Sequence, residues 1–126
     1  MAYRQPLCIV IRLPNVTLPQ AELEAALGRC LDRYEPTRDR ASTYAQIDIP
    51  GDRDQWAAAL DYVQALHDPV HRLVQESLIG RPYLDIALTF PPSAGSRSLT
   101  IPARLAAAAG EAGMDVEVSV YASETD

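Results

Sequence analysis

Residues 83–90 read Tyr-Leu-Asp-Ile-Ala-Leu-Thr-Phe, and this stretch decides the class of fold. Large apolar residues occupy every second position from Leu84 to Phe90, and Pro91 ends the alternation. A period of two is typical of a β-strand that buries one face and exposes the other. The chain is therefore expected to build a sheet that is covered on one side only.

The same alternation predicts three further strands, at residues 7–13, 43–49 and 114–121. A short strand at 98–101 is predicted to return beside residues 83–90 as an antiparallel hairpin. In the last strand the pattern predicts a buried row, formed by Met114, Val116, Val118 and Val120. Residues 35–42 show no periodic pattern, so they are predicted to form an exposed loop.

Helices are predicted where apolar residues recur every three or four positions. The first covers residues 18–32, and an alanine-rich one begins near Pro102 and is closed by Gly113. Between them, a long helical pattern runs from Trp56 almost to Gly80. Pro69 interrupts this pattern and removes a backbone hydrogen bond, so a kinked helix or two end-to-end helices are expected.

Together these elements predict a single α+β domain over residues 1–126. The expected architecture is a two-layer sandwich, in which a mixed or antiparallel sheet of four or five strands carries the helices on one face. Its βαβ units relate it to ferredoxin-like folds, with an extra, kinked helix before the hairpin.

Composition excludes several classes of function. The 126 residues include 17 acidic and 11 basic ones, for a net charge of -6. Nucleic acid is not expected as a direct partner, because no basic stripe is present to contact phosphates. Every basic residue is an arginine, which excludes lysine Schiff bases and a lysine phosphate loop. No apolar run approaches the roughly 18 residues of a membrane span, so a cytoplasmic protein without membrane contact is expected.

Cysteines and histidines are the candidates for metal or nucleophilic chemistry. Cys8 and Cys30 lack any metal-ligand spacing and are predicted to be buried free thiols. His67 and His71 stand four residues apart, a spacing that on a straight helix offers two nitrogens to zinc. If Pro69 begins a new helical segment, the two rings need not converge, and no third ligand follows at motif spacing. We expect no metal and no cofactor. A small-molecule-binding protein or enzyme, with a pocket near these histidines, is the alternative.

The polar side of the predicted sheet is the main candidate for a binding surface. The residues expected to bind a partner there are Tyr44, Asp48, Tyr83, Asp85, Asp115, Glu117 and Tyr121. Arg12 shares this side, and Arg38 and Arg40 in the predicted loop are expected at its rim. An ordinary solvated sheet face produces the same alternation. Tyrosines and grouped carboxylates favour instead the docking of a cationic protein. Glycosidase-like acid–base catalysis by Asp85 and Asp115 would require a cleft, and an open sheet face rarely forms one.

The C-terminal third carries a resemblance. Leu99-Thr100-Ile101-Pro102, the helix that follows, and Met114-Asp115-Val116-Glu117-Val118-Ser119-Val120-Tyr121 resemble a family of small uncharacterised bacterial proteins. The chain is also similar to the small acidic α/β immunity proteins that accompany bacterial polymorphic toxins. The resemblance implies a non-enzymatic inhibitor that neutralises a cognate toxin, and supplies no catalytic residues. A self-associating module, which forms a homodimer through the sheet face or an edge strand, is a further alternative.

Overall fold

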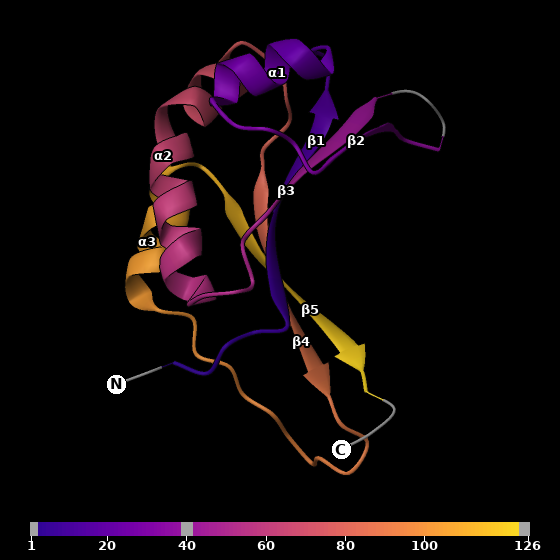
Figure 1. The fold of residues 1–126 in the computed structure, drawn as a ribbon, viewed down its shortest axis with the longest axis vertical. Helices are drawn as coiled ribbons and strands as arrows, with labels where there is room; N and C mark the ends of the chain where they lie inside the picture. The colour runs from indigo at the N-terminus through magenta and orange to yellow at the C-terminus, as the bar shows by residue number, and fades with distance from the viewer. Residues whose placement is uncertain (1–2, 39–41, 124–126) are drawn as a thin grey trace.

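The computed structural model describes residues 3–38 and 42–123, which form one sheet and one helical layer. The five strands are β1 (Cys8–Val16), β2 (Arg33–Pro36), β3 (Thr43–Asp48), β4 (Tyr83–Phe90) and β5 (Asp115–Ala122), in the order β2-β3-β1-β4-β5. Three helices, α1 (Gln20–Leu27), α2 (Gln55–Gln75) and α3 (Ala103–Glu111), cover one side of this sheet (Figure 1). The predicted α+β class with a mixed sheet is confirmed.

The strand order shows how the sheet is assembled. β1 lies at the centre, antiparallel to both β3 and β4, and β2 pairs antiparallel with β3. The run β1-α1-β2-β3-α2-β4 therefore has the split βαβ arrangement of ferredoxin-like sheets. The extra unit is α3 with β5, which adds a parallel strand beyond β4, and not the long helix α2 as expected.

Helix α2 is continuous from Gln55 to Gln75, so the expectation of two end-to-end helices is wrong. Asp54 caps its start, because the carboxylate Oδ1 accepts a hydrogen bond of 3.1 Å from the Trp56 amide. Pro69 lies inside the helix. Buried side chains of α2 lie on both sides of this proline: Val63, Leu66, Val70 and Leu73. We attribute the unbroken helix to their burial, which outweighs the missing hydrogen bond.

Two other predicted segments differ from the structure. Residues 98–101 form no strand, and β4 pairs instead with β5 in parallel along its whole length. The antiparallel hairpin was therefore a wrong prediction, because the sheet position beside β4 is taken by β5. Residues 33–36, partly predicted as loop, form the short edge strand β2 against β3. The first helix ends early, at Leu27, because Gly28 adopts a left-handed φ of 71° and its amide bonds back to the Glu24 carbonyl.

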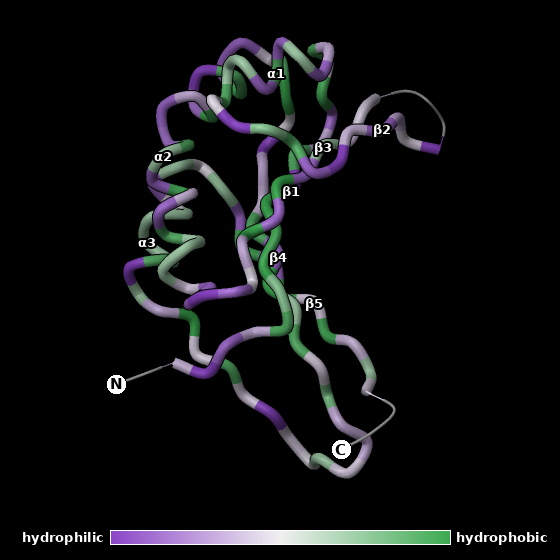
Figure 2. Tube along the Cα trace, in the orientation of Figure 1, coloured by the Kyte–Doolittle hydropathy of each residue, from purple (hydrophilic) through white to green (hydrophobic). Residues whose placement is uncertain are grey.

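The core lies between the sheet and the helices. Ile9, Ile11 and Leu13 of β1 are fully buried, and Leu23 and Leu66 cover them from the helical layer. Hydrophobic residues recur along the central strands and along the helices in Figure 2. Within the described residues, no helix combines the length and apolar character that a membrane span requires.

The apolar row of β5 is not part of this core, contrary to the sequence prediction. Val116, Val118 and Val120 are 40%, 48% and 58% exposed, whereas Met114 just before the strand is buried. These valines are exposed because β5 is an edge strand whose C-terminal end projects past α3 (Figure 1). Cys8 and Cys30 are also exposed, so their predicted burial is wrong; Cys8 lies on the uncovered side of the sheet and Cys30 follows α1.

Candidate functional site

The strand register gathers polar side chains on the side of the sheet that faces away from the helices. We call this surface the polar face; its described polar members are Cys8, Arg12, Arg33, Glu35, Tyr44, Gln46, Asp48, Tyr83, Asp85, Thr89, Asp115, Glu117, Ser119 and Tyr121. Figure 1 shows no helix over this side. The predicted tyrosines and carboxylates therefore do share one uncovered surface, which spans all five strands.

Arg12 is the centre of the polar face. Its Nε donates to Asp85 Oδ2 at 2.8 Å, and its Nη1 donates to Tyr44 Oη at 2.5 Å and to Gln46 Oε1 at 3.2 Å. Burial lowers the pKa of Arg12, but the hydrogen bonds to Asp85 and Tyr44 outweigh burial and raise the pKa above its ordinary value. The guanidinium is thus a fixed positive charge that ties β1 to β3 and β4.

Asp85 is buried, although it was expected to be an exposed docking carboxylate. It is only 4% exposed and accepts a second hydrogen bond, of 2.7 Å, from Ser119 Oγ on β5. Its position on the polar side of β4 was predicted correctly, but Arg12 and Ser119 from the neighbouring strands cover it. Asp85 therefore positions the surface and is excluded from direct contact with a large partner.

The hydrogen-bond network continues along β3. Tyr44 Oη donates to Gln46 Oε1 at 2.7 Å, and Gln46 Nε2 donates to Asp48 Oδ1 at 2.6 Å. The guanidinium carbons of Arg12 and Arg33 lie 5.9 Å and 5.6 Å from the centre of the Tyr44 ring. Contacts of this kind hold an aromatic ring in place, so Tyr44 presents an ordered, half-buried edge.

The charges of this network largely cancel, and the remainder is negative. Arg12 pairs with Asp85, and Arg33 pairs with Glu35. Arg81, which precedes β4, approaches exposed Asp115 at 3.7 Å. Asp48 and Glu117 are exposed, and among the described residues neither is in an ion pair. Asp32 adds a further carboxylate beside β3, where its Oδ2 accepts from the Asp48 amide at 2.7 Å. The polar face is therefore net acidic.

Two groups of the polar face have raised pKa values. For Cys8 the causes are partial burial and the negative charges of Asp85 and Asp48, which together exceed the opposite effect of Arg12. For Tyr83 the main cause is again partial burial. A thiol whose pKa is raised is mostly protonated at neutral pH and is a weak nucleophile. The raised pKa therefore argues against Cys8 as a nucleophile.

The predicted rim is only partly described. Arg38 is exposed in the connection between β2 and β3, beyond the end of β2. Arg40 lies outside the described residues.

The two histidines lie against each other, so the alternative in which a new segment begins at Pro69 and His67 falls outside it is wrong. Their ring centroids are 4.7 Å apart in an edge-on arrangement, because α2 is continuous and places positions four apart on one side. His71 Nε2 contacts the Glu111 carbonyl oxygen at 2.6 Å, and His67 Nδ1 contacts Asp68 Oδ1 at 2.8 Å. Among the described residues, no three histidine, cysteine or acidic side chains are grouped to hold a metal.

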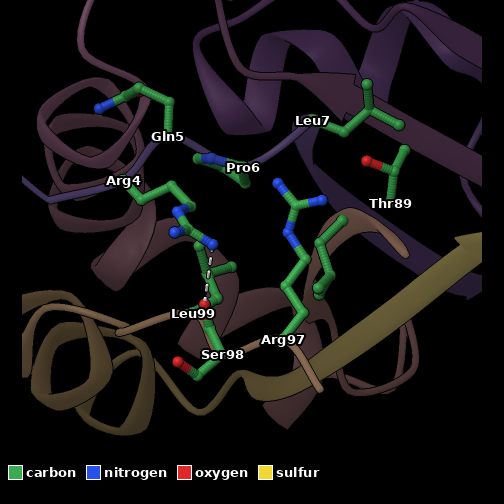
Figure 3. A pocket seen from close by; sticks show the side chains of 9 residues that line it. Arg4, Gln5, Pro6, Leu7, Thr89, Arg97, Ser98 and Leu99 are labelled. Carbon is green, nitrogen blue, oxygen red and sulfur yellow. Dashed lines mark hydrogen bonds between the residues drawn. The ribbon is translucent and has the colours of Figure 1, made fainter. Parts of the chain in front are cut away.

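Three cavities lined by described residues lie elsewhere. None of the three has His67 or His71 in its lining. A shallow one of about 640 Å³ borders Asp48 and Asp32 at the edge of the polar face. A smaller pocket of about 160 Å³ is formed by the segment before β1, the end of β4 and the connection to α3, and the side chains of Arg4 and Arg97 point into it (Figure 3).

No family model, curated protein or solved structure matches the chain significantly. Its function is therefore argued from its own residues.

Two features were not found from the sequence, one on the polar face and one at the pocket of Arg4 and Arg97. Arg33 and Glu35 belong to it, but β2 is too short for its alternation to stand out. Arg4 and Arg97 are 93 positions apart, and only the folded chain brings them to one pocket. The first feature had a detectable signal, since polar Arg33 and Glu35 flank Tyr34 at the start of the predicted loop.

Proposed function

We propose that the protein is a non-enzymatic binding protein that docks a basic protein partner on its polar face. More specifically, we propose an immunity-type inhibitor in the bacterial cytoplasm, which covers the active site of a cognate toxin. The observation that carries the proposal is the uncovered, hydrogen-bonded polar face with unpaired acidic groups at Asp48 and Glu117. A preordered surface loses little conformational entropy when a partner binds.

Charge supports a basic partner. The chain has a net charge of -6, and the polar face keeps exposed carboxylates after its own ion pairs are formed. Complementary charge raises the rate of association and makes it sensitive to salt. Toxins that act on nucleotides or nucleic acids need basic sites to hold phosphates, so an acidic surface is complementary to such a site.

The contact residues follow from exposure on this face. Tyrosines bind well at interfaces because they bury large area with little loss of side-chain freedom. The proposed contacts are Tyr44, Asp48, Tyr83, Asp115, Glu117 and Tyr121, with Arg38 at the rim. Asp85 is assigned to positioning, because it is buried under Arg12.

The test compares two variants with the same change in net charge. Asp48→Lys combined with Glu117→Lys alters the polar face, whereas Glu22→Lys combined with Asp61→Lys alters exposed positions of the helical layer. Each immobilised protein is incubated at low salt with lysate of the cells that encode it. A protein that the wild type and the helical-layer variant retain is then purified, and its activity and association rate are measured.

The expected partner is basic, is retained by the wild type and the helical-layer variant but not by the polar-face variant, and is inhibited on binding. Its association rate falls about tenfold or more in the polar-face variant and falls with added salt. Equal retention by all three proteins, or no retained protein, overturns docking on the polar face. A partner whose activity is unchanged overturns the inhibitor function.

As a second candidate we propose binding of a small molecule at the pocket of Figure 3, because none of the three cavities has His67 or His71 in its lining. Arg4 Nη1 donates to the Ser98 carbonyl at 3.4 Å, and none of the described residues that line the pocket carries a carboxylate. Two guanidinium groups without an acidic neighbour favour a small oxyanion. Inorganic phosphate should raise the melting temperature relative to chloride at equal ionic strength, and Arg97→Gln should remove the increase. An increase that persists in Arg97→Gln contradicts this candidate.

Self-association into a homodimer is proposed as well. The observation that favours it is the exposed valine row of β5.

A further inference from the structure

Strand β5 has an open edge that nothing in the described chain covers. It pairs with β4 on one side only, and its register runs from Tyr83↔Asp115 to Phe90↔Ala122 without a shift. Natural proteins protect such edges with charged side chains, lysine above all, with proline, with a bulge or with a very short strand. β5 has eight residues, Asp-Val-Glu-Val-Ser-Val-Tyr-Ala, with no lysine, proline or bulge, and its charged side chains, Asp115 and Glu117, are confined to its first half. Its outer backbone groups are therefore free to pair with another strand.

The side chains of β5 divide sharply between its two faces. Val116, Val118 and Val120 lie on the side of the helices and become more exposed toward the end of the strand. On the polar side, the first half of the strand carries the acids Asp115 and Glu117, and the second half carries hydroxyl groups. A partner strand must bury the valines and must not bring carboxylates against the acids.

A second copy of β5, running in the opposite direction, meets both requirements. We propose that two copies of this chain pair antiparallel through β5 about a two-fold axis at Val118, and join their sheets into one. In this register Val118 faces Val118 of the second copy, and Val116 faces Val120 of the second copy. On the polar side, Glu117 faces Ser119 of the second copy and Asp115 faces Tyr121 of the second copy. No carboxylate faces another carboxylate, and Asp115 faces a tyrosine hydroxyl that can donate to it.

Alternative registers are less favourable for physical reasons. Directly opposed residues of an antiparallel pair lie on the same face, so the axis must pass through a residue position of β5. An axis at Glu117 opposes two carboxylates, which is destabilising. An axis at Ser119 places Val116 against Ala122 and so loses valine pairs. A parallel copy, aligned residue by residue, would bring the acids of both copies side by side.

This proposal names the surface for the self-association stated above and is independent of the basic partner of the polar face. The two respond to salt in opposite directions. Each copy carries a charge of -6, so added salt screens the repulsion between copies and strengthens the dimer. The same salt weakens capture of a basic partner. The effect of salt therefore distinguishes a failure of dimerisation through β5 from a failure of binding to a basic partner.

The first experiment is sedimentation equilibrium of the purified full chain over a wide range of concentrations, at low and high salt. The wild type should show a monomer–dimer equilibrium that salt shifts toward the dimer. Val118→Lys places two ammonium groups at the axis and should weaken dimerisation at least about 100-fold. Leu7→Lys is the matched control, because Leu7 is 58% exposed but precedes β1, away from the β5 edge; its dimer should persist.

A second experiment tests the register. In a Cys8→Ser, Cys30→Ser background, Val118→Cys should form a covalent dimer on mild oxidation, because opposed Cβ atoms lie about 4.5–5.5 Å apart. Val116→Cys should not, because its counterpart is displaced by four residues, or about 13 Å. A monomer at all concentrations, or a dimer that Val118→Lys leaves unchanged, overturns the proposal. Cross-linking through position 116 and not 118 overturns the register.

Discussion

The ion pair between Arg12 and Asp85 should be strongly coupled, and a double-mutant cycle measures this directly. The variants are Arg12→Met, Asp85→Leu and the two combined. The side chains of Arg12 and Asp85 are 24% and 5% exposed, so replacing Arg12 leaves a nearly buried carboxylate with only the Ser119 hydroxyl as partner. Removing one partner of a fully buried pair costs about 3–5 kcal/mol.

Because Arg12 keeps part of its contact with water, we expect Arg12→Met to cost about 2–3 kcal/mol. The double variant should cost less than the sum of the single variants, with a coupling free energy of about 1.5 kcal/mol or more. Urea denaturation followed by circular dichroism at neutral pH gives each free energy of unfolding, and unchanged denaturant slopes show that the comparison is valid.

The control is Arg33→Met. The side chains of Arg33 and its partner Glu35 are 49% and 51% exposed, so this substitution should cost less than about 1 kcal/mol. Additivity of the Arg12 and Asp85 substitutions to within about 0.5 kcal/mol would refute the reasoning, since it would mean that the carboxylate does not depend on the guanidinium.

Three further predictions concern a helix cap, a thiol and the core. The hydrogen bond from Gln5 lowers the pKa of Asp54. The charged carboxylate therefore stabilises the fold at pH values above the ordinary pKa of an aspartate, and this stabilisation is lost as the pH falls through the lowered pKa. Asp54→Asn should make the melting temperature depend less on pH in the acid range. Asp48 raises the pKa of Cys8, so Asp48→Asn should lower the pH midpoint of iodoacetamide reaction in a Cys30→Ser background; an unchanged midpoint contradicts that cause. Leu66→Ala, at a fully buried position, should cost about 2–5 kcal/mol in urea denaturation, and a loss well below this range would mean that α2 packs loosely.

The central part of the fold could be predicted because its alternation is strong. Ile9, Ile11 and Leu13 on β1, like the apolar positions of β4, identify both the strand and its buried side. The pattern of residues 98–101 was misleading, because alternation reveals a half-buried strand but not its neighbour. Four residues were too few to separate a strand from a turn, and β5, far along the chain, took the place beside β4.

The side of the sheet on which each candidate residue lies could be predicted from the sequence, but the exposure of its side chain could not. Alternation places Asp85 and Glu117 on the same side, yet Asp85 is buried by Arg12 and Ser119 from other strands, and Glu117 is exposed. The same limit applies to Val118, whose apolar side was assigned correctly but which no helix covers. Exposure depends on what other segments contribute, and a local pattern does not contain that information.

The central position of β1 also affects the order in which the sheet can form as the chain is synthesised. β1 is synthesised first, but both of its neighbours in the sheet, β3 and β4, come from later segments. β1 can therefore pair on both sides only after residue 90 has left the ribosome. The βαββαβ unit is then complete, while α3 and β5 are still to come. During that interval β4 is a temporary edge, and nascent chains on one messenger could pair through it before β5 closes that position.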